Sequence, residues 1–344
     1  MIPAAIRSVL LGIVAAMLEL CVATNQAGSA TLLKLVTWAA PKSPQEGALR
    51  DFAQRVQDQA KGAIRIELID GSKEKITFGE AVKRIKSGEL AGGVIPLSSV
   101  ESSIPKVATL SLPFLFADDK HLEQVIFGEI GQKLLSEISE AVQVRSLSFF
   151  QNVVVDLGSS KEPIVKSSDL RGRKLGVARD IERISFSMLG AQTQLLPFSQ
   201  LQIALANEQV DTTDAVVYSG LEGRAMVEAW APIVKYLSAT EHSRGMSVLM
   251  INAGVFNALS RELQGALLDG AKQSALLNDK HLREGKQQSL VELNKKGIKI
   301  VVADRAELRG ALEKLFEDPP TPIDKELLNK IRRVCRVPPF CFRL

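Results

Sequence analysis

The residue types that most often carry catalysis are sparse in this sequence. Its three histidines, His121, His242 and His281, lie far apart, and none stands in a metal-ligand spacing such as HExxH. No GxSxG nucleophile elbow, Walker A loop or GxGxxG run occurs. The sequence therefore favours a binding protein over an enzyme, and we expect no catalytic residues, no metal site and no cofactor.

The three histidines have simpler explanations than catalysis. His121 and His281 fall on predicted helices and are expected to be solvated. His242 stands in the run Thr240-Glu241-His242-Ser243, in a segment that we expect to cross between two blocks of the fold. For His242 a structural hydrogen-bonding role is favoured over a catalytic one.

Composition sets the broad class of the protein. The chain has 344 residues, of which 46% are hydrophobic and 24% are charged, which is enough apolar mass for one large domain or two medium ones. The net charge of +4 is spread along the chain, with no run of Lys and Arg interleaved with aromatic residues. Nucleic acid is therefore not an expected partner.

The first 30 residues differ from the rest of the chain. Arg7 is the only charge before Glu19, and the apolar run Val9–Leu18 between them is too short to span a bilayer. Small residues follow at Ala27–Ala30, so residues 1–30 are predicted to be a secretory signal, with a buried N-terminal helix as the alternative. Lipidation at Cys21 is disfavoured because a leucine precedes it.

Export bears on the two cysteines near the C-terminus. In an oxidising compartment Cys335 and Cys341 can close a small disulfide loop. The alternative is two free thiols in a frayed tail, and the sequence does not decide between them.

The elements that must position any binding residues alternate between strand and helix. Thr31–Trp38 is predicted as a strand, and Ser43 as the cap of a helix that begins at Pro44. A second block carries the predicted strands Lys174–Ala178 and Asp214–Tyr218, and a helical pattern runs from Ser260 to about Lys296.

No low-complexity linker separates the two blocks, so we expect strands to cross between them. The predicted fold is α/β, with two domains, a ligand cleft between the lobes and the long helix as a brace. Lobe I comprises residues 31–151 and 246–316, lobe II residues 152–245, and residues 317–344 form a C-terminal tail.

Several motifs, in order, resemble the DctP-type solute receptors of TRAP transporters. The resemblance covers about Thr31 to Phe316, and no single motif is highly specific. The segments that carry it include Leu112–Phe116 (LPFLF), Phe127–Leu135, Asp169–Leu175 (DLRGRKL), Pro197–Ser199 and Val210-Asp211.

The resemblance implies the two-domain periplasmic binding protein fold. It further implies a periplasmic receptor, a monomer that closes on a small polar ligand and delivers it to the small and large TRAP membrane subunits. An alternative is an exported receptor-like protein that acts as a sensor partner or scaffold.

The chain departs from the family where ligands are held. The family arginine that clamps a substrate carboxylate falls on Gly176, and a second family arginine falls near Val155 or Asp156. Arg179 lies three residues beyond the first position, either as a substitute or as a solvated helix start. The asparagine that often follows the family's VD pair is also missing, since Thr212 and Thr213 follow Val210-Asp211.

These departures predict an altered ligand. Asp156 and Asp214 are expected to meet a cationic or hydroxyl-rich molecule, and Trp38 is expected either to stack on a ring or quaternary amine or simply to pack. The predicted ligand-binding residues are Trp38, Phe114, Asp156, Gly176, Arg179 and Asp214.

Overall fold

The structure, a computed structural model, describes residues 30–219 and 228–334. Residues 1–29 of the predicted signal at residues 1–30, with Cys21, and the pair Cys335 and Cys341 lie outside the described residues. The strands are β1 Thr31–Thr37, β2 Ile64–Asp70, β3 Gly92–Pro96, β4 Arg145–Ser159, β5 Lys174–Val177, β6 Gln192–Leu195, β7 Thr212–Ser219, β8 Tyr236–Ile251 and β9 Lys299–Val302. The helices are α2 Pro44–Gln59, α3 Phe78–Ser87, α4 Asp119–Ile126, α5 Glu129–Val142, α6 Asp180–Met188, α7 Phe198–Ala206, α9 Ala253–Ala258, α10 Arg261–Lys295, α11 Arg305–Ala311, α12 Glu313–Glu317 and α13 Lys325–Arg333.

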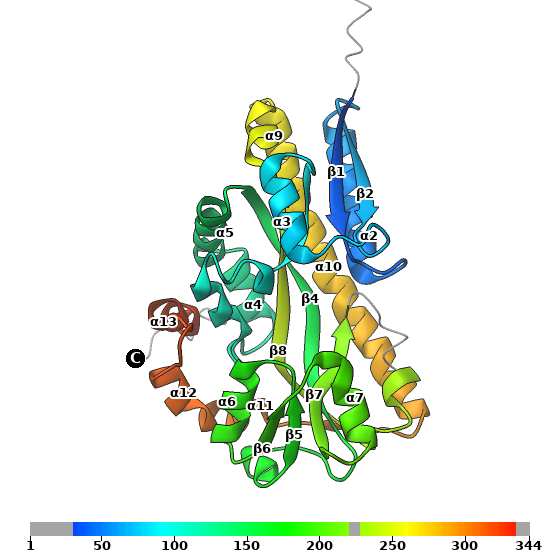
Figure 1. The fold of residues 1–344 in the computed structure, drawn as a ribbon, viewed down its shortest axis with the longest axis vertical. Coiled ribbons are helices and arrows are strands. Elements are labelled where there is room, and N and C mark those ends of the chain that lie inside the picture. Colours follow the sequence, from blue (N-terminus) through cyan, green and yellow to red (C-terminus); the bar gives the residue numbers. More distant parts are fainter. Residues whose placement is uncertain (1–29, 220–227, 335–344) are drawn as a thin grey trace, which may run out of the picture.

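The described strands form one mixed sheet with helices on its faces. Its order is β2-β1-β3-β8-β4-β7-β5-β6, and β9 pairs with β8 off this path. The long antiparallel strands β4 and β8 run from the upper half of the molecule into the lower half (Figure 1). This arrangement confirms the predicted two-lobed α/β fold, with β1 to β3 above and β5 to β7 below.

Helix α10 spans both halves as the predicted brace (Figure 1). It begins after Ser260, whose side chain accepts a hydrogen bond from the Leu263 backbone N–H and so satisfies one free donor of the first turn. The predicted cap of α2 is also confirmed, because Ser43 Oγ accepts from Glu46 N at 3.2 Å and Pro44 occupies the first turn.

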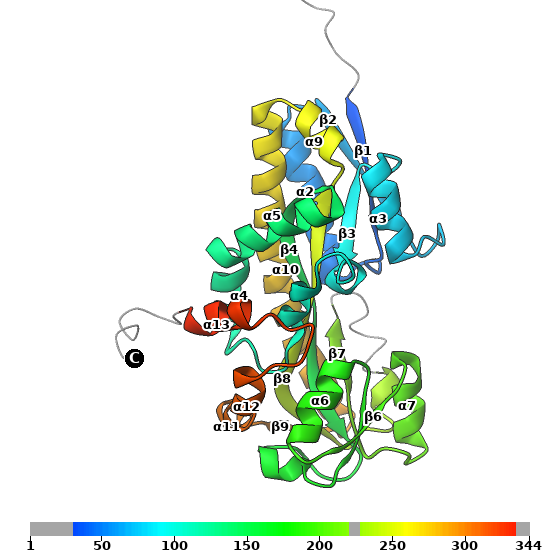
Figure 2. The ribbon, with the colours of Figure 1, turned by 60° about the vertical axis from the view of Figure 1, so that its left-hand side comes forward.

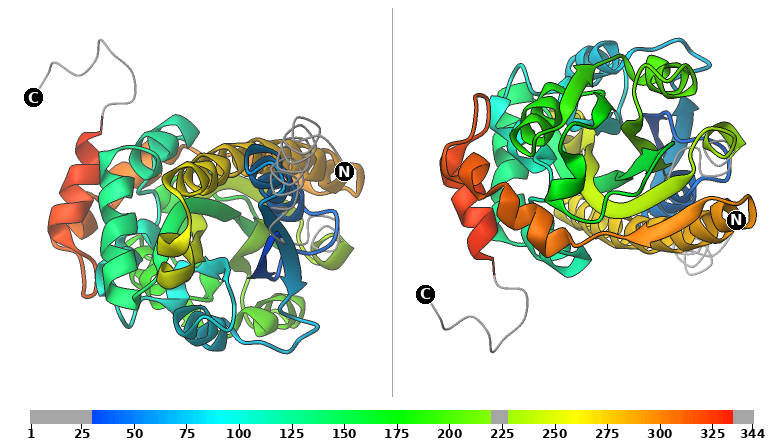
Figure 3. Two further views of the ribbon diagram at one scale, coloured as in Figure 1. Left: turned by 90° about the horizontal axis from the view of Figure 1, so that it is seen from above. Right: turned by 90° about the horizontal axis from the view of Figure 1, so that it is seen from below.

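The apolar core has three parts. One lies in the upper half between β1, α2 and α10 and contains Phe52 and Leu267, and one lies in the lower half around α7 and contains Leu201. The largest runs through both halves and includes residues from β5, α6 and α13. Figures 2 and 3 show helices packed around the sheet.

The C-terminal region packs on the protein, where the sequence suggested a tail. In α13, Leu327, Leu328 and Ile331 are buried in the largest core. The carbonyl oxygen of Ile331 lies 2.9 Å from His121 Nε2 of α4, and both views of Figure 3 place α13 beside the helices of the upper half. The expectation that His121 is solvated is therefore wrong, because this residue is buried and holds α13 in place.

The predicted lobe boundaries coincide with an irregularity in the crossing strands. The pairing of β4 and β8 shifts between Gln151 and Val153, which lie opposite Met246 and Gly245. The boundaries at 151/152 and 245/246 remain predictions, and this break in the ladder supports them. Within the part of the chain that the structure describes, no helix combines the length and apolarity needed to cross a membrane.

Candidate functional site

A bulge in β8 creates the site. Val155 of β4 pairs with Ser243 and Leu157 with Ser238, so residues 239–242 of β8 lie opposite Asp156 alone. Asp156 Oδ1 accepts a hydrogen bond from the Glu241 backbone N–H at 2.6 Å, and Glu241 adopts a φ of 43°. Left-handed backbone at a residue other than glycine is uncommon and gathers at functional sites. The bulge carries two clusters of polar side chains.

The first cluster, here called the ion-pair cluster, consists of Asp156, Glu241, Lys286, Arg244 and Arg305. Lys286 Nζ of α10 lies 3.4 Å from the fully buried Asp156 Oδ2 and also bonds Glu241. Glu241 Oε2 lies 3.0 Å from Arg244 and 2.9 Å from Arg305 of α11. Each carboxylate therefore meets at least one cation, and the cluster ties α10 and α11 to the bulge.

Burial and charge compete within the ion-pair cluster. Burial raises the pKa of Asp156, and Lys286 with the Glu241 backbone N–H opposes this only in part. Burial also acts to raise the pKa of Glu241, but Lys286, Arg244 and Arg305 outweigh it and lower this pKa below its ordinary value. The cluster therefore holds Glu241 ionised.

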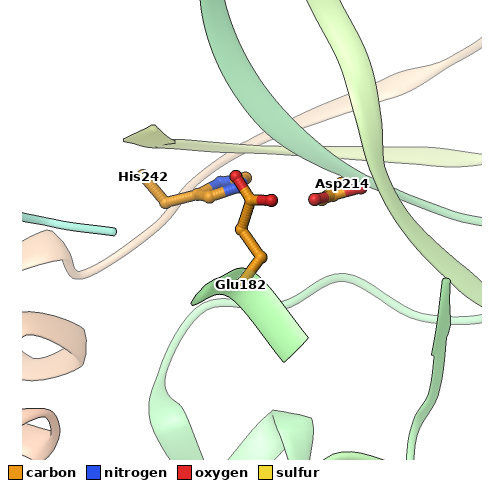
Figure 4. A group of neighbouring side chains, drawn as sticks. All are labelled: Glu182, Asp214 and His242. Carbon is orange, nitrogen blue, oxygen red and sulfur yellow. The ribbon is translucent and has the colours of Figure 1, made fainter. Parts of the chain in front are cut away.

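The second cluster, here called the acceptor cluster, consists of Glu182 of α6, Asp214 of β7 and His242 of β8. One ligand-type atom of each residue lies within 4.8 Å of the others, and all three residues are buried. Figure 4 shows the two carboxylates and the imidazole turned toward one another. Among the described residues, Asp214 Oδ1 and His242 Nε2 have no hydrogen-bond partner.

Arg179 borders the acceptor cluster at the start of α6. Its Nε donates to Glu182 Oε2 at 2.9 Å, and its Nη2 bonds both Glu182 Oε1 and Ser243 Oγ. The Arg179 side chain is still 38% exposed, whereas the Glu182 side chain is only 2% exposed. The guanidinium therefore covers the cluster from the side that solvent reaches.

Burial dominates the protonation of the acceptor cluster. It raises the pKa of Asp214 well above the ordinary value, Glu182 raises it further, and Arg179 opposes the shift. Burial lowers the pKa of His242 to about 3, reinforced by the positive charges of Arg179 and Arg305. The imidazole is thus neutral at physiological pH.

Two phenylalanines enclose His242. The Phe114 backbone N–H donates to the His242 carbonyl oxygen at 2.6 Å, and Phe114 adopts a φ of 58°. The Phe114 and Phe186 ring centroids lie 6.0 and 5.2 Å from that of His242. The strained Phe114 backbone is therefore fixed against the bulge, and the aromatic rings keep this side of the cluster apolar.

The structure brings some of the predicted ligand-binding residues together. Asp214 belongs to the acceptor cluster, Arg179 borders it, and Phe114 contacts His242. Asp156 lies on the same bulge but belongs to the ion-pair cluster. Their roles in binding remain predictions.

Gly176 and Trp38 have different surroundings. A Cβ added at Gly176 would lie 3.0 Å from Leu201 Cδ2 and 3.4 Å from Val210 Cγ2, so a side chain at this position starts toward the core beneath α7. Trp38 donates from Nε1 to the Ile76 carbonyl oxygen at 3.2 Å and packs edge-on against Phe78. These contacts are those of a packing residue at the edge of the upper half.

Sequence reasoning missed Glu182 and gave His242 only a structural role. The polar run from Thr240 to Arg244, inside an otherwise apolar strand, was the available signal for His242. Nothing in the sequence distinguishes Glu182 from other acidic residues in the first turn of a helix, because Asp214 and His242, the other two members of the acceptor cluster, lie 32 or more residues away.

The geometry of the acceptor cluster suits binding of a donor-rich group. Asp214 Oδ1 and His242 Nε2 are acceptor atoms held in an apolar enclosure without a partner among the described residues. Leaving a buried acceptor unpaired costs about 1–3 kcal/mol. A bound cation or hydroxyl group removes that cost, so the arrangement favours binding at this point.

Comparison with known proteins identifies relatives over most of the chain. Residues 35–318 match the bacterial extracellular solute-binding protein family 7, DctP. The 2,3-diketo-L-gulonate-binding periplasmic protein YiaO of Escherichia coli is 25% identical over 284 residues, which cover 80% of this chain and 82% of that protein.

Solved structures share the fold. A TRAP periplasmic solute binding protein from Ochrobactrum anthropi, with its C-terminus bound in the ligand binding pocket, has a TM-score of 0.78 at 20% identity, covering 88% of this chain and 93% of that chain. The sugar acid binding protein of Advenella mimigardefordensis, in complex with galactonate, has a TM-score of 0.70 at 22% identity, covering 88% of this chain and 97% of that chain. The family match, over residues 35–318, favours the receptor over the sensor or scaffold alternative.

Proposed function

Because the chain belongs to the bacterial extracellular solute-binding protein family 7, DctP, and is thus a solute-binding receptor, we propose that it captures a hydroxyl-rich or cationic metabolite. It does so in the periplasm, after removal of a signal within residues 1–30, and delivers the solute to the small and large membrane subunits of a TRAP transporter. It releases the solute chemically unchanged.

The observation that carries the proposal is a pair of buried acceptors beside the crossing strand, Asp214 Oδ1 and His242 Nε2, which have no hydrogen-bond partner in residues 30–219 and 228–334. Asp214 lies on β7 in the lower half, and His242 lies on the bulge of β8, which Phe114 of the upper half contacts. A solute bound here touches parts of both halves. Such a solute stabilises the closed arrangement over the open one, which is how a hinged receptor responds to its ligand.

The charge of the site argues for a ligand unlike those of the relatives. The Escherichia coli and Advenella proteins are described with 2,3-diketo-L-gulonate and galactonate, which are sugar acids. In this chain one family arginine position holds Gly176 and the other falls near Val155 or Asp156, and Arg179 is already bonded to Glu182 and Ser243. Asp214 adds a further acidic group.

The free energies involved show why the missing arginines should decide which ligand binds. Burial of an ionised carboxylate without a partner costs several kcal/mol. Binding in the millimolar to micromolar range provides only about 4–8 kcal/mol in total. Loss of the arginine clamp therefore removes most of the affinity for a simple monocarboxylate, whereas hydroxyl or ammonium donors pair with the free acceptors.

The test is a thermal-shift screen of the metal-free protein against a metabolite library, followed by calorimetry of the best compound beside its matched acid, amide and amine. We expect the amide, polyol or amine to bind at least about tenfold more tightly than the acid. Tight binding of a plain monocarboxylate that survives Arg179→Ala would contradict the proposal. NMR of the incubated ligand should show no turnover.

A companion variant, Gly176→Arg, restores the family residue. Its side chain starts toward Leu201 and Val210, so its thermal stability must be measured beside its affinity for the acid. If the clamp is the missing element, affinity for the acid rises.

A further inference from the structure

We propose that Glu182, Asp214 and His242 form a site for one divalent transition-metal ion of the zinc class, and that Arg179 is a built-in competitor for it. The sequence gives no sign of such a site, because its three histidines are scattered and no ligand spacing occurs. The site arises only when α6, β7 and β8 meet.

The geometry of the three side chains supports the proposal. One imidazole nitrogen and two carboxylate oxygens lie within 4.8 Å of one another, each from a different element of the fold. A zinc ion takes histidine nitrogen and carboxylate oxygen at about 2.0–2.2 Å, so a modest contraction of the triangle places all three around one ion. Figure 4 shows that the three groups already face a common point.

Two of the three ligand atoms are free to bind. Asp214 and His242 are 4% and 2% exposed, and within the described ranges Asp214 Oδ1 and His242 Nε2 have no hydrogen-bond partner. His242 Nδ1 lies 2.9 Å from Thr240 Oγ1. When Nδ1–H donates to this hydroxyl, Nε2 presents its lone pair to the cluster, which is the way that outer contacts orient a metal-binding histidine.

Glu182 can bind a metal ion although it already bonds Arg179. Both of its oxygens bond Arg179, but an ionised carboxylate offers about four lone-pair positions, so each oxygen retains one. Arg179 is partly exposed and is able to swing away, in contrast to the buried ligands. The guanidinium and a metal ion therefore compete for the charge of Glu182.

The ligand set selects the class of ion. Imidazole suits zinc, copper, iron and nickel, whereas calcium and magnesium prefer sites made of oxygen alone. Three protein ligands leave a coordination position open, as in zinc sites that bind a further molecule. Phe114 and Phe186 beside His242 supply the apolar shell that limits access of water.

The experiment is calorimetric titration of the EDTA-stripped full chain with Zn²⁺, and with Ca²⁺ and Mg²⁺ in parallel. Cobalt absorption spectra provide a readout of the ligand field. We expect one saturable Zn²⁺ site, at least about 100-fold tighter than for Ca²⁺ or Mg²⁺, and intense visible bands of Co²⁺ that zinc removes. Absence of a saturable Zn²⁺ site, or equal affinity for Ca²⁺, would overturn the proposal.

Variants locate the site. Asp214→Asn and His242→Gln should each weaken Zn²⁺ binding by about 100-fold, while Arg179→Gln should strengthen it by about tenfold because the competing cation is removed. His281→Gln, which removes a histidine outside the cluster, is the matched control and should leave Zn²⁺ affinity unchanged. If His281→Gln costs as much as His242→Gln, or if Asp214→Asn costs nothing, zinc binds elsewhere and the proposal fails. Circular dichroism checks that each variant is folded, and the cobalt spectrum of the wild type stands without any variant.

The outcome is separable from the proposed function. Solute binding is measured on metal-free protein with organic compounds, whereas this titration uses the metal alone. A protein that binds a solute but no zinc keeps its function as a receptor and loses only the metal site.

Discussion

The two polar clusters on the bulge of β8 differ in how their charges are matched. In the ion-pair cluster, Asp156 and Glu241 meet Lys286, and Glu241 also meets Arg244 and Arg305. In the acceptor cluster, Glu182 is paired with a cation, Arg179. Asp214 Oδ1 and His242 Nε2 have no hydrogen-bond partner among the described residues.

The difference separates a structural role from a binding role. A buried charge that is paired and hydrogen-bonded fixes one arrangement of the chain, and removal of one partner is costly. A buried acceptor that lacks a partner lowers stability until a ligand supplies one. We therefore propose that the ion-pair cluster holds α10 and α11 on the crossing strand and that the acceptor cluster binds the ligand.

The largest expected effect comes from breaking the ion-pair cluster. Lys286→Met leaves the fully buried Asp156 without its cation, so the free energy of unfolding should fall by about 3–5 kcal/mol, and Tm by several degrees. Thermal and urea unfolding measure both. Lys280→Met, at an exposed position on the same helix, is the matched control and should change little. Equal loss in the two variants would show that the ion-pair cluster has no structural role.

The second largest effect concerns Asp279 of α10, a buried carboxyl group outside both clusters whose protonation makes stability depend on pH. Burial raises the pKa of Asp279 to about 7, although the side-chain hydrogen bond from Asn278 opposes this shift, and among the described residues its Oδ2 has no partner. Between about pH 4 and pH 7 the folded protein thus holds a proton that the unfolded chain has released. Stability therefore falls as the pH rises through this interval.

Asp279→Asn removes this dependence. The variant should be more stable than the wild type at pH 8, by on the order of 2–3 kcal/mol, and the difference should shrink toward pH 4. Urea unfolding of both proteins across this range measures it. If the difference in unfolding free energy is constant with pH, or if the variant is less stable at pH 8, then a partner stabilises the ionised Asp279 and burial does not control its protonation.

The smallest effect should come from the acceptor cluster itself. Asp214→Asn keeps the shape of the side chain and removes a buried acid that burial and Glu182 disfavour. We expect the ligand-free variant to be as stable as the wild type or more stable by about 1 kcal/mol, the opposite sign to Lys286→Met. A marked fall in Tm of ligand-free Asp214→Asn would make this cluster structural as well.

Local patterns predicted the architecture well. The cap at Ser43, the long helix after Ser260 and the alternation of strands and helices depend on neighbouring residues, and the structure confirms them. β8 extends well beyond its apolar part, Met246–Ile251, because Ser238, Ser243 and Arg244 also pair with β4. An apolar pattern marks only the part of a strand that faces the core.

The site was predictable only in part. Asp214 and Arg179 stood out because they lie near family positions, but the bulge that sets residues 239–242 opposite Asp156 depends on pairing between distant strands. Glu182 and His242 meet through this tertiary geometry alone. His121 was misjudged for the same reason, since its partner Ile331 lies 210 residues away.

The most direct test of the assignment is calorimetry of the solute found by screening, on metal-free wild type, Asp214→Asn and Asp279→Asn. The account predicts that Asp214→Asn loses about 100-fold in affinity while remaining as stable as the wild type, and that Asp279→Asn binds normally. If Asp214→Asn binds the solute as tightly as the wild type, the acceptor cluster is not where this receptor holds its ligand.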